Sequence, residues 1–233
     1  MDQQEYWRMF HLVRGDVEAA IKCSGIYLTI NRLAVADYDT AMRFNGHAEF
    51  WNVTKHGLQI GMFMAIGRAF DQRRDAYTIE DVVDQTIEHP GFFSKSALRE
   101  RKREVSKIFG DQEDPPWLVE YIRDAWEPTR KELEALRTAL EPHVLKFREV
   151  YEPIRNQYFA HRGRASQDVI DELFSKTAIS EVADMLRFAY GLIGGIQQMA
   201  NNATPPGKWS DGGYHRLFRV HEEKTESLVK SLP

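Results

Sequence analysis

A chain of 233 residues with 42% hydrophobic and 28% charged residues has the size and composition of a globular protein with a substantial core. Its formal net charge of −4 excludes a global basic field that would hold nucleic acid, so any anion-binding site must be local. The single cysteine, Cys23, excludes an internal disulfide framework and, with no signal-peptide pattern and no apolar stretch long enough to span a bilayer, favours a cytoplasmic location.

Apolar residues recur at intervals of three and four through the first part of the chain, which is typical of amphipathic helices. Thr78 is expected to cap a short helix, because Asp81 follows it three residues later in the position of a capping box. The first two long helices are separated by a short helical piece that Asn45-Gly46 ends. The predicted helices cover residues 5–34, 37–43, 47–70 and 79–88.

The same periodicity continues to the end of the chain, and the period-two alternation of strands is nearly absent. We therefore predict an all-α fold, a multi-helix bundle with long antiparallel core helices, formed as a single domain over residues 1–233. Residues 214–233 are expected to form a loosely packed C-terminal helix. Gly191, Gly194 and Gly195 in the last core helix should let a neighbouring backbone approach closely. The predicted helices cover residues 95–109, 117–126, 130–164, 168–174, 179–202 and 214–232.

The longest of these runs, residues 130–164, organises the rest of the prediction. Pro142 and Pro153 each remove a backbone donor and clash with the preceding turn, so we expect a kink or a restart at each. The helix is expected to end at His161-Arg162-Gly163, where glycine can adopt the left-handed cap conformation. Its apolar stripe consists of Leu133, Leu136, Leu140, Val144, Phe147, Tyr151, Ile154 and Tyr158.

The last turns of this helix carry the residues best suited to phosphodiester chemistry. Arg155 can give paired N–H donors to a phosphate, and His161 can move a proton near neutral pH. Asn156 follows the arginine directly, and Arg162 and Arg164 add positive charge after the histidine. The sequence therefore offers Arg155 and His161 as candidate catalytic residues, with Asn156, Arg162 and Arg164 as candidate substrate-binding residues.

Spacing alone does not single out this pair. Two other Arg–His pairs have a similar interval, namely Arg137 with His143 and Arg216 with His221. The neighbouring Asn156 and the basic helix end distinguish the first pair, whereas the alternative interpretation is a solvated basic helix end with a partly buried histidine.

Helical geometry places a further condition on the site. At about 100° per residue, positions six apart lie about 120° apart around a helix, so Arg155 and His161 flank the apolar stripe on opposite sides. Either the helix is distorted between Pro153 and Gly163, or a second subunit supplies the other half of the site. We therefore expect a homodimer, in which a two-fold axis would bring two arginines and two histidines together.

The segment R-N-Q-Y-F-A-H, residues 155–161, resembles the Arg–polar–His signature of the HEPN superfamily of all-α nucleases and nucleotide-binding domains. The order of other features is similar to that of AbiU-type abortive-infection proteins, which confer phage resistance. Those features are G-R-A-F-D at residues 67–71, T-I-E-D-V at residues 78–82 and a basic helix before the Arg–His segment. The resemblance covers roughly residues 50–199.

The resemblance implies RNA cleavage at a dimer cleft without a metal or cofactor. Arg155 would bind the scissile phosphate, His161 would transfer a proton as the 2′-hydroxyl attacks, and Asn156 would orient the substrate or the histidine. The products would carry a cyclic phosphate and a free 5′-hydroxyl. The sequence departs from some members in having Gly163 where they carry a tyrosine.

Two other functions fit the same residues. One is a non-catalytic helical dimer that binds RNA, a nucleotide or a partner protein such as an antitoxin, and the other is a purely structural adaptor. Motifs for zinc, di-iron, P-loop and Gly-x-Ser-x-Gly sites are absent from the sequence, so no metal site is expected.

Three other groups of residues have both a functional and a structural interpretation. The first could border an anion site or form a solvated helix end, and consists of Arg68, Asp71, Arg73 and Arg74. The second could track an RNA backbone or pair with the interleaved Glu100 and Glu104, and consists of Arg99, Arg101, Lys102 and Arg103. Tyr158 and Phe159 could stack on a base, although Tyr158 lies on the apolar stripe and is expected in the core.

Overall fold

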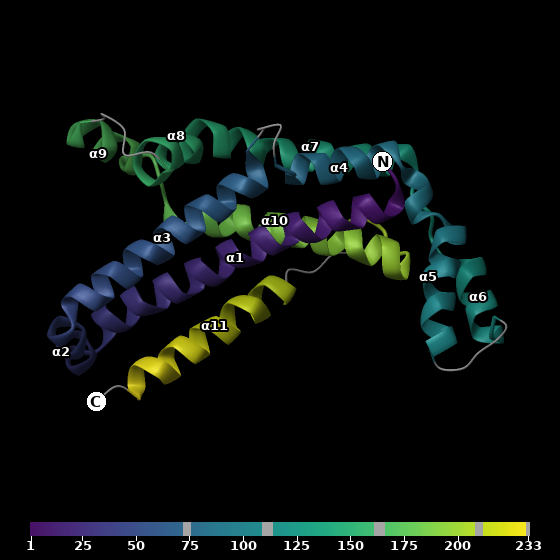
Figure 1. Ribbon diagram of the computed structural model, residues 1–233. Helices are drawn as coiled ribbons and strands as arrows, with labels where there is room; N and C mark the ends of the chain where they lie inside the picture. The colour runs from purple at the N-terminus through teal and green to yellow at the C-terminus, as the bar shows by residue number, and fades with distance from the viewer. Residues whose placement is uncertain (72–75, 109–113, 161–165, 208–211, 232–233) are drawn as a thin grey trace.

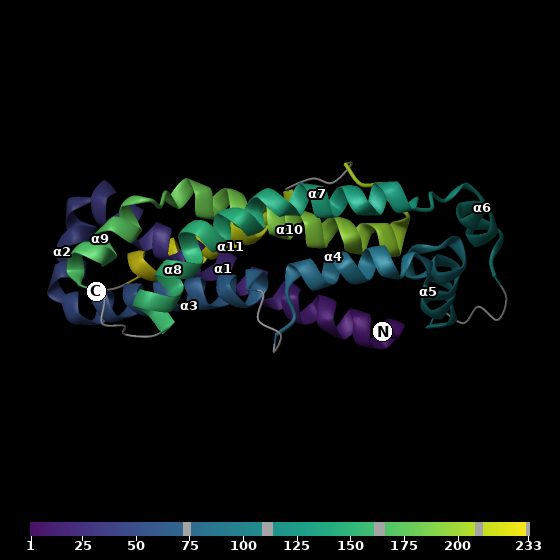
Figure 2. The ribbon, with the colours of Figure 1, turned by 90° about the horizontal axis from the view of Figure 1, so that it is seen from above.

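The computed structural model describes residues 1–71, 76–108, 114–160, 166–207 and 212–231. Within those ranges the chain is helical and contains no strand, which confirms the all-α prediction. Figures 1 and 2 show an elongated bundle of long helices with a pair of short helices at one end. None of the helices in these ranges combines the length and apolarity needed to cross a bilayer.

The helix boundaries agree closely with the predicted ones, except in the run predicted as one helix over residues 130–164. The N-terminal part contains α1 (Gln3–Ala36), α2 (Tyr38–Gly46), α3 (Ala48–Phe70), α4 (Ile79–Glu88), η1 (Pro90–Phe93), α5 (Lys95–Ile108) and α6 (Pro116–Asp124). The C-terminal part contains α7 (Arg130–Lys146), η2 (Phe147–Tyr151), α8 (Glu152–Ile154), η3 (Arg155–Ala160), α9 (Gln167–Ser175), α10 (Ile179–Asn202) and α11 (Gly212–Lys230).

Local side-chain chemistry sets where α4 begins. The Thr78 hydroxyl accepts a hydrogen bond from the Asp81 backbone N–H at 3.3 Å, and the Asp81 carboxylate accepts one from the Thr78 N–H at 2.8 Å. The predicted capping box is therefore present. An equivalent box of Thr129 and Glu132 begins α7, so Pro128 precedes the cap residue. Each box satisfies backbone donors that a helix start would otherwise leave unpaired.

Most of the apolar side chains form one cluster, the main core. It draws on α1, α3, α4, α7, η2 and α10, which is why the long helices lie side by side in Figures 1 and 2. A second set, the small cluster, lies where α1, α2, α3 and α11 meet. The small cluster consists of Ile30, Leu33, Phe44, Trp51 and Val229.

The helix α11 lies along α1 on the side away from α3 (Figure 1). Tyr214 at its start and Val229 near its end are buried against this surface, at 4% and 1% exposure. Between them, Arg32 of α1 forms an ion pair with Glu222 at 3.2 Å. The single helix α1 therefore packs against α3 on one side and α11 on the other.

The basic helix α5 attaches the α5–α6 pair to the end of α10. The Arg101 guanidinium donates to the Ala200 carbonyl at 2.7 Å and to the Phe92 carbonyl at 2.9 Å, and Lys102 donates to the Asn202 side chain at 3.1 Å. Cationic donors at the last carbonyls of a helix stabilise its C-terminus.

Arg99 and Arg103 instead form ion pairs with Asp114, across the loop that joins α5 to α6. Each of the four basic residues considered for RNA contact therefore binds another group of the protein. These groups are two backbone carbonyls, the Asn202 side chain and Asp114.

Candidate functional site

The run that the sequence predicted as one long helix changes its winding twice. It passes through Pro142 as part of α7, and then the Glu152 N–H bonds to the Phe147 carbonyl, five residues back, which is the π-helical pattern. Pro153 opens α8, and a second π-helical segment, η3, starts at Arg155. The expected distortion after Pro153 is therefore present.

The wider winding moves one residue off the predicted stripe. Tyr158 was expected in the core, but 38% of its surface is exposed, because π-helical turns shift the residues after Ile154 around the axis. The other seven stripe residues are buried, namely Leu133, Leu136, Leu140, Val144, Phe147, Tyr151 and Ile154.

Arg155, the first residue of η3, is buried with 5% exposure. Its Nη1 donates to Asp71 Oδ2 at 2.7 Å, while Nε and Nη2 donate to Asn156 Oδ1 at 3.1 and 2.8 Å. The candidate phosphate-binding cation therefore has a fixed position, in which Asp71 balances its charge and Asn156 orients its guanidinium plane.

A glycine on α3 makes room for this arginine. A Cβ added to Gly67 would lie against Arg155 Cδ and 2.6 Å from Nη1, which is closer than real Cβ contacts come. Asp71 lies one helical turn further on, at the C-cap of α3, with its N–H bonded to the Gly67 carbonyl at 2.8 Å. The motif G-R-A-F-D thus forms a notch with a carboxylate at its end, and Arg155 fills it.

The two ion pairs at this end of α3 have different environments. Asp71 and Arg155 have side-chain exposures of 9% and 6%, whereas the pair of Asp16 with Arg68 has exposures of 21% and 52%. The interpretation of Asp71 as part of a solvated helix end is therefore wrong, and for Arg68 it is correct. Arg73 and Arg74 lie outside the described residues.

Aromatic rings cover the side of η3 that faces α3. Phe159 stacks on Phe63 with ring centroids 4.4 Å apart, and the exposed Tyr158 contacts Phe174 edge-on at 5.2 Å. His56 of α3 lies 6.4 Å from both the Tyr158 and the Phe159 ring. The Phe159 ring therefore packs against other residues of the protein, while Tyr158 remains partly exposed to solvent.

The titratable group one turn before Arg155 is a tyrosine. The Tyr151 hydroxyl donates to Glu181 Oε2 at 3.2 Å, and burial followed by the nearby Glu181 charge raises the pKa of Tyr151. Lys146 donates to the same carboxylate at 2.7 Å and lowers the pKa of Glu181. Tyr151 therefore stays protonated at neutral pH and positions the helix instead of accepting a proton.

Of the five residues predicted for the site, Arg155 and Asn156 lie together and are hydrogen-bonded. His161, Arg162 and Arg164 lie outside the described residues, as does the predicted helix end at Gly163. The sequence prediction missed Gly67 and assigned no such role to Asp71, although a glycine and an aspartate one turn apart at a helix end were visible in the sequence.

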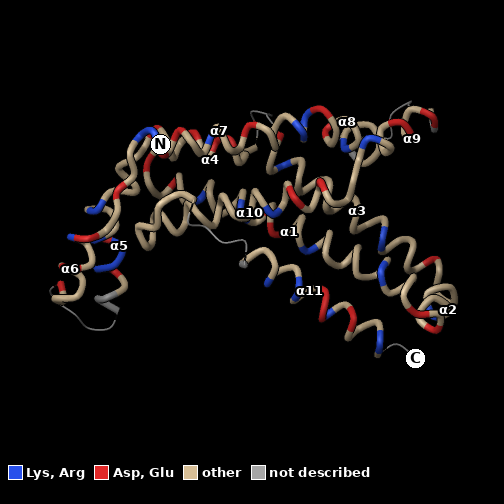
Figure 3. The backbone as a smooth tube through the Cα atoms, turned by 180° about the vertical axis from the view of Figure 1, so that it is seen from behind, with Lys and Arg blue, Asp and Glu red and all other residues tan. Residues whose placement is uncertain are grey.

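Among the described residues, charge is not gathered on one face of the bundle. Figure 3 shows lysine and arginine interspersed with aspartate and glutamate along the helices. Within the described part of the chain, no group of three or more histidine, cysteine, aspartate or glutamate side chains could hold a metal ion.

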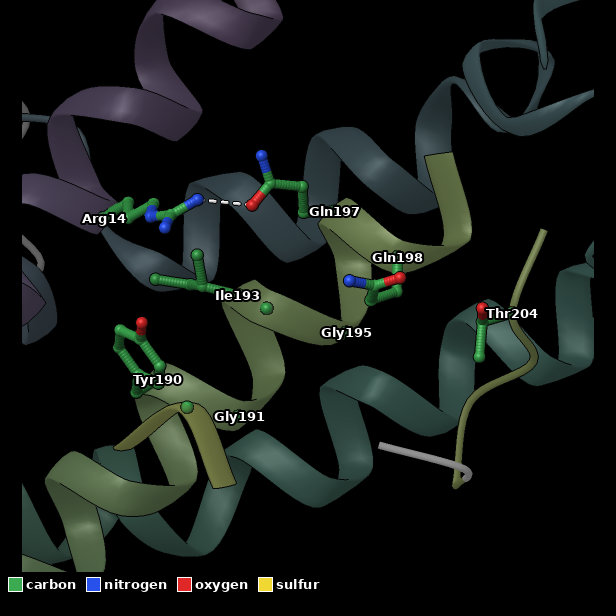
Figure 4. Close-up of a pocket in the computed structure, with 10 residues that line it drawn as sticks. Arg14, Tyr190, Gly191, Ile193, Gly195, Gln197, Gln198 and Thr204 are labelled. Atoms are coloured by element: carbon green, nitrogen blue, oxygen red, sulfur yellow. Dashed lines mark hydrogen bonds between the residues drawn. The ribbon is translucent and has the colours of Figure 1, made fainter. Parts of the chain in front are cut away.

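Gly191 and Gly194 of α10 do not serve the close packing that was predicted, whereas Gly195 is buried. Among the described residues, no atom outside the helix lies within 4 Å of a Cβ built on Gly191 or Gly194, and this face lines a cavity of about 350 Å³ instead. Figure 4 shows Arg14 reaching across it to bond Gln197. Arg14 also pairs with Glu18 at 2.8 Å, so its charge is balanced within the protein.

The chain is all-α in its described residues, and in the sequence Arg155 and Asn156 precede His161, the order noted above for HEPN-type proteins. The family model HEPN_AbiU2, described as AbiU2, matches residues 4–215. The chain therefore belongs to the AbiU2 family of HEPN-type abortive-infection proteins. Neither the curated proteins nor the solved structures contained a match to the chain.

Proposed function

We propose that this protein is a cytoplasmic homodimer that cuts RNA without a metal ion, as part of an abortive-infection response to phage. The observation that carries the proposal is the fixed Arg155–Asn156 pair in the chain segment that leads to His161, within a HEPN_AbiU2 match over residues 4–215.

The reaction is an internal transesterification at phosphorus. The RNA 2′-hydroxyl attacks the adjacent phosphate and loses its proton, while the bond to the 5′-oxygen breaks and that oxygen gains a proton. His161 accepts the first proton, and a water molecule supplies the second. Arg155 stabilises the charge that develops on the phosphate oxygens.

The contacts of Arg155 define how it would meet a phosphate. A guanidinium has five N–H donors, and Asp71 and Asn156 take three of them. One N–H on each terminal nitrogen remains, and a paired phosphate contact needs two. Because Arg155 is 5% exposed, the RNA must reach it through a rearrangement of the surrounding chain.

The same burial favours a second candidate. If the pair with Asp71 persists in the presence of RNA, Arg155 acts as a structural anchor for η3, and the protein is a non-catalytic dimer that binds RNA, a nucleotide or a partner protein such as an antitoxin. The two candidate functions differ in whether the protein cleaves RNA and so forms new RNA ends.

The test is cleavage of end-labelled mixed RNA by the purified protein in EDTA. We expect products with a cyclic phosphate and a 5′-hydroxyl, and a loss on the order of a hundredfold or more for His161→Ala and Arg155→Lys. Arg216→Ala is the matched control, because that exposed arginine precedes His221 at a similar interval. RNA binding without cleavage would support the non-catalytic dimer.

Mixed dimers test whether the cleft is shared. Arg155→Lys and His161→Ala chains are inactive alone, but a mixed dimer contains one intact Arg155 and one intact His161. Recovery of part of the activity on mixing supports a site built across the two-fold axis. A mixture as inactive as its components contradicts the shared cleft, because it would mean that both residues must come from one chain.

A further inference from the structure

An apolar groove runs over the small cluster. Its floor is α1, its walls are α3 and α11, and its volume is about 500 Å³. Ile30, Trp51 and Val229 at its base are buried, whereas Phe50 and Leu228 on its walls are 62% and 60% exposed. A cavity of this size with a mainly apolar lining is typical of a small-molecule site.

A lysine and a histidine lie along one wall of this groove. Lys224 and His221 are three residues apart on α11, so both lie on the same side of that helix. Among the described residues the carboxylates of Glu222 and Glu226 pair with Arg32 and Lys230, and no ion pair of Lys224 is present. The Nδ1 atom of His221 is buried without a hydrogen-bond partner. Burial, followed by the charges of Lys22 and Lys224, lowers the pKa of His221.

We propose that this groove binds a free medium-chain carboxylate. The alkyl chain lies between Phe50 and Leu228 over the small cluster, and the carboxylate pairs with Lys224 beside His221. The apolar lining favours a chain because each buried CH₂ contributes to affinity, and the unpaired lysine favours an anionic head. This ligand site is independent of the RNA cleavage proposed above, since none of its residues belongs to the Arg155 cluster.

Calorimetric titration with decanoate, below its micelle concentration, tests the proposal. We expect one molecule bound per chain, and affinity on the order of a hundredfold weaker for hexanoate, which lacks four CH₂ groups. Decyltrimethylammonium has the same chain with a positive head, so its binding should be undetectable. Equal binding of the two decyl compounds, or no binding of decanoate, overturns the proposal.

Variants on α11 test where the ligand binds. Lys224→Glu should weaken decanoate at least tenfold, because it replaces the cation at the head with a repelling carboxylate. Leu228→Glu should weaken it similarly by placing a charge along the chain. Lys230→Glu is the matched control, since Lys230 lies on the same helix but pairs with Glu226 and does not line the groove.

The variants are exposed, so their thermal unfolding should match that of the unchanged protein, and this comparison separates lost binding from lost fold. An equal loss of affinity in Lys230→Glu would mean that only the net charge matters, and would overturn the assignment to the groove. Binding to anionic vesicles without binding of free decanoate would also overturn it, in favour of a membrane surface.

Discussion

The main core and the small cluster differ in how completely they are closed. Around the main core, α3 and η3 enclose even a charged group, because Gly67 leaves space for Arg155 and Asp71 balances its charge. Over the small cluster, Phe50 and Leu228 leave apolar surface open to solvent. The comparison shows that one bundle of helices contains both a fixed internal cation and an open apolar groove.

The largest effect should come from removing the partner of the buried cation. Asp71→Ala leaves Arg155 charged and buried without its counter-ion, and we expect the free energy of unfolding to fall by about 3–5 kcal/mol. Asp16→Ala, which removes the partner of the exposed Arg68, should lower it by less than about 1 kcal/mol. Urea denaturation of both variants measures the difference, and similar losses would mean that the Arg155 site is not closed to water.

A second prediction concerns the notch itself. Gly67→Ala places a methyl group against the Arg155 side chain, so we expect it to destabilise the protein by about 1–3 kcal/mol through overpacking. Gly57→Ala on the same helix meets nothing within 4 Å and should instead stabilise it by up to about 1 kcal/mol, through helix propensity. Opposite signs in the two melting temperatures support the notch, and a stabilising Gly67→Ala contradicts it.

Much of the fold could be predicted because helix positions depend on residues that are close together in the sequence. The period of the apolar residues identified the long helices, and Thr78 with Asp81 marked the start of α4. The exception was the end of the longest run, because a π-helical turn depends on how η3 packs against α3 and leaves no periodic signal of its own. Tyr158 was therefore misplaced.

The candidate site was predictable only in part. Arg155 and Asn156 are adjacent in the sequence, so their proximity could be predicted without knowledge of the fold. Their partner Asp71 is 84 residues away from Arg155, and only the packing of α3 against η3 brings it to 2.7 Å. In the same way, Gly191 and Gly194 indicated a close approach, but glycine also leaves space, and here that space is a cavity.

A third prediction compares two adjacent residues of α11, Val229 in the small cluster and Leu228 on the groove wall. Val229→Ala removes a buried side chain, 1% exposed, and should lower the free energy of unfolding by about 2 kcal/mol, from lost burial and the space left behind. Leu228→Ala removes one that is 60% exposed, and should change it by less than about 0.5 kcal/mol. Equal effects would mean that the groove is closed in solution.

The smallest expected effect is on the pH dependence of stability, to which His143 and His221 contribute in different parts of the molecule. His143 of α7 stacks on Phe188 with ring centroids 3.9 Å apart, and burial lowers its pKa, with Asp184 opposing the shift. His221 in the groove also has a lowered pKa, from burial and then from Lys22 and Lys224.

A histidine with a lowered pKa in the folded state binds a proton less readily there than in the unfolded chain. The stability that its neutral form contributes is therefore complete above the unfolded pKa, near 6.5, and is lost as the pH falls through that value. His143→Gln and His221→Gln should each flatten the fall of the urea midpoint between about pH 7.5 and pH 5.5.

Decanoate should then distinguish the two histidines. A carboxylate beside His221 favours its protonated form and raises its pKa, so saturating decanoate should reduce the acid sensitivity that His221 contributes. His143 does not line the groove, so the contribution removed by His143→Gln should be the same with and without decanoate. If decanoate changed both contributions alike, the two regions would be coupled, and the contrast between a closed core and an independent open groove would not hold.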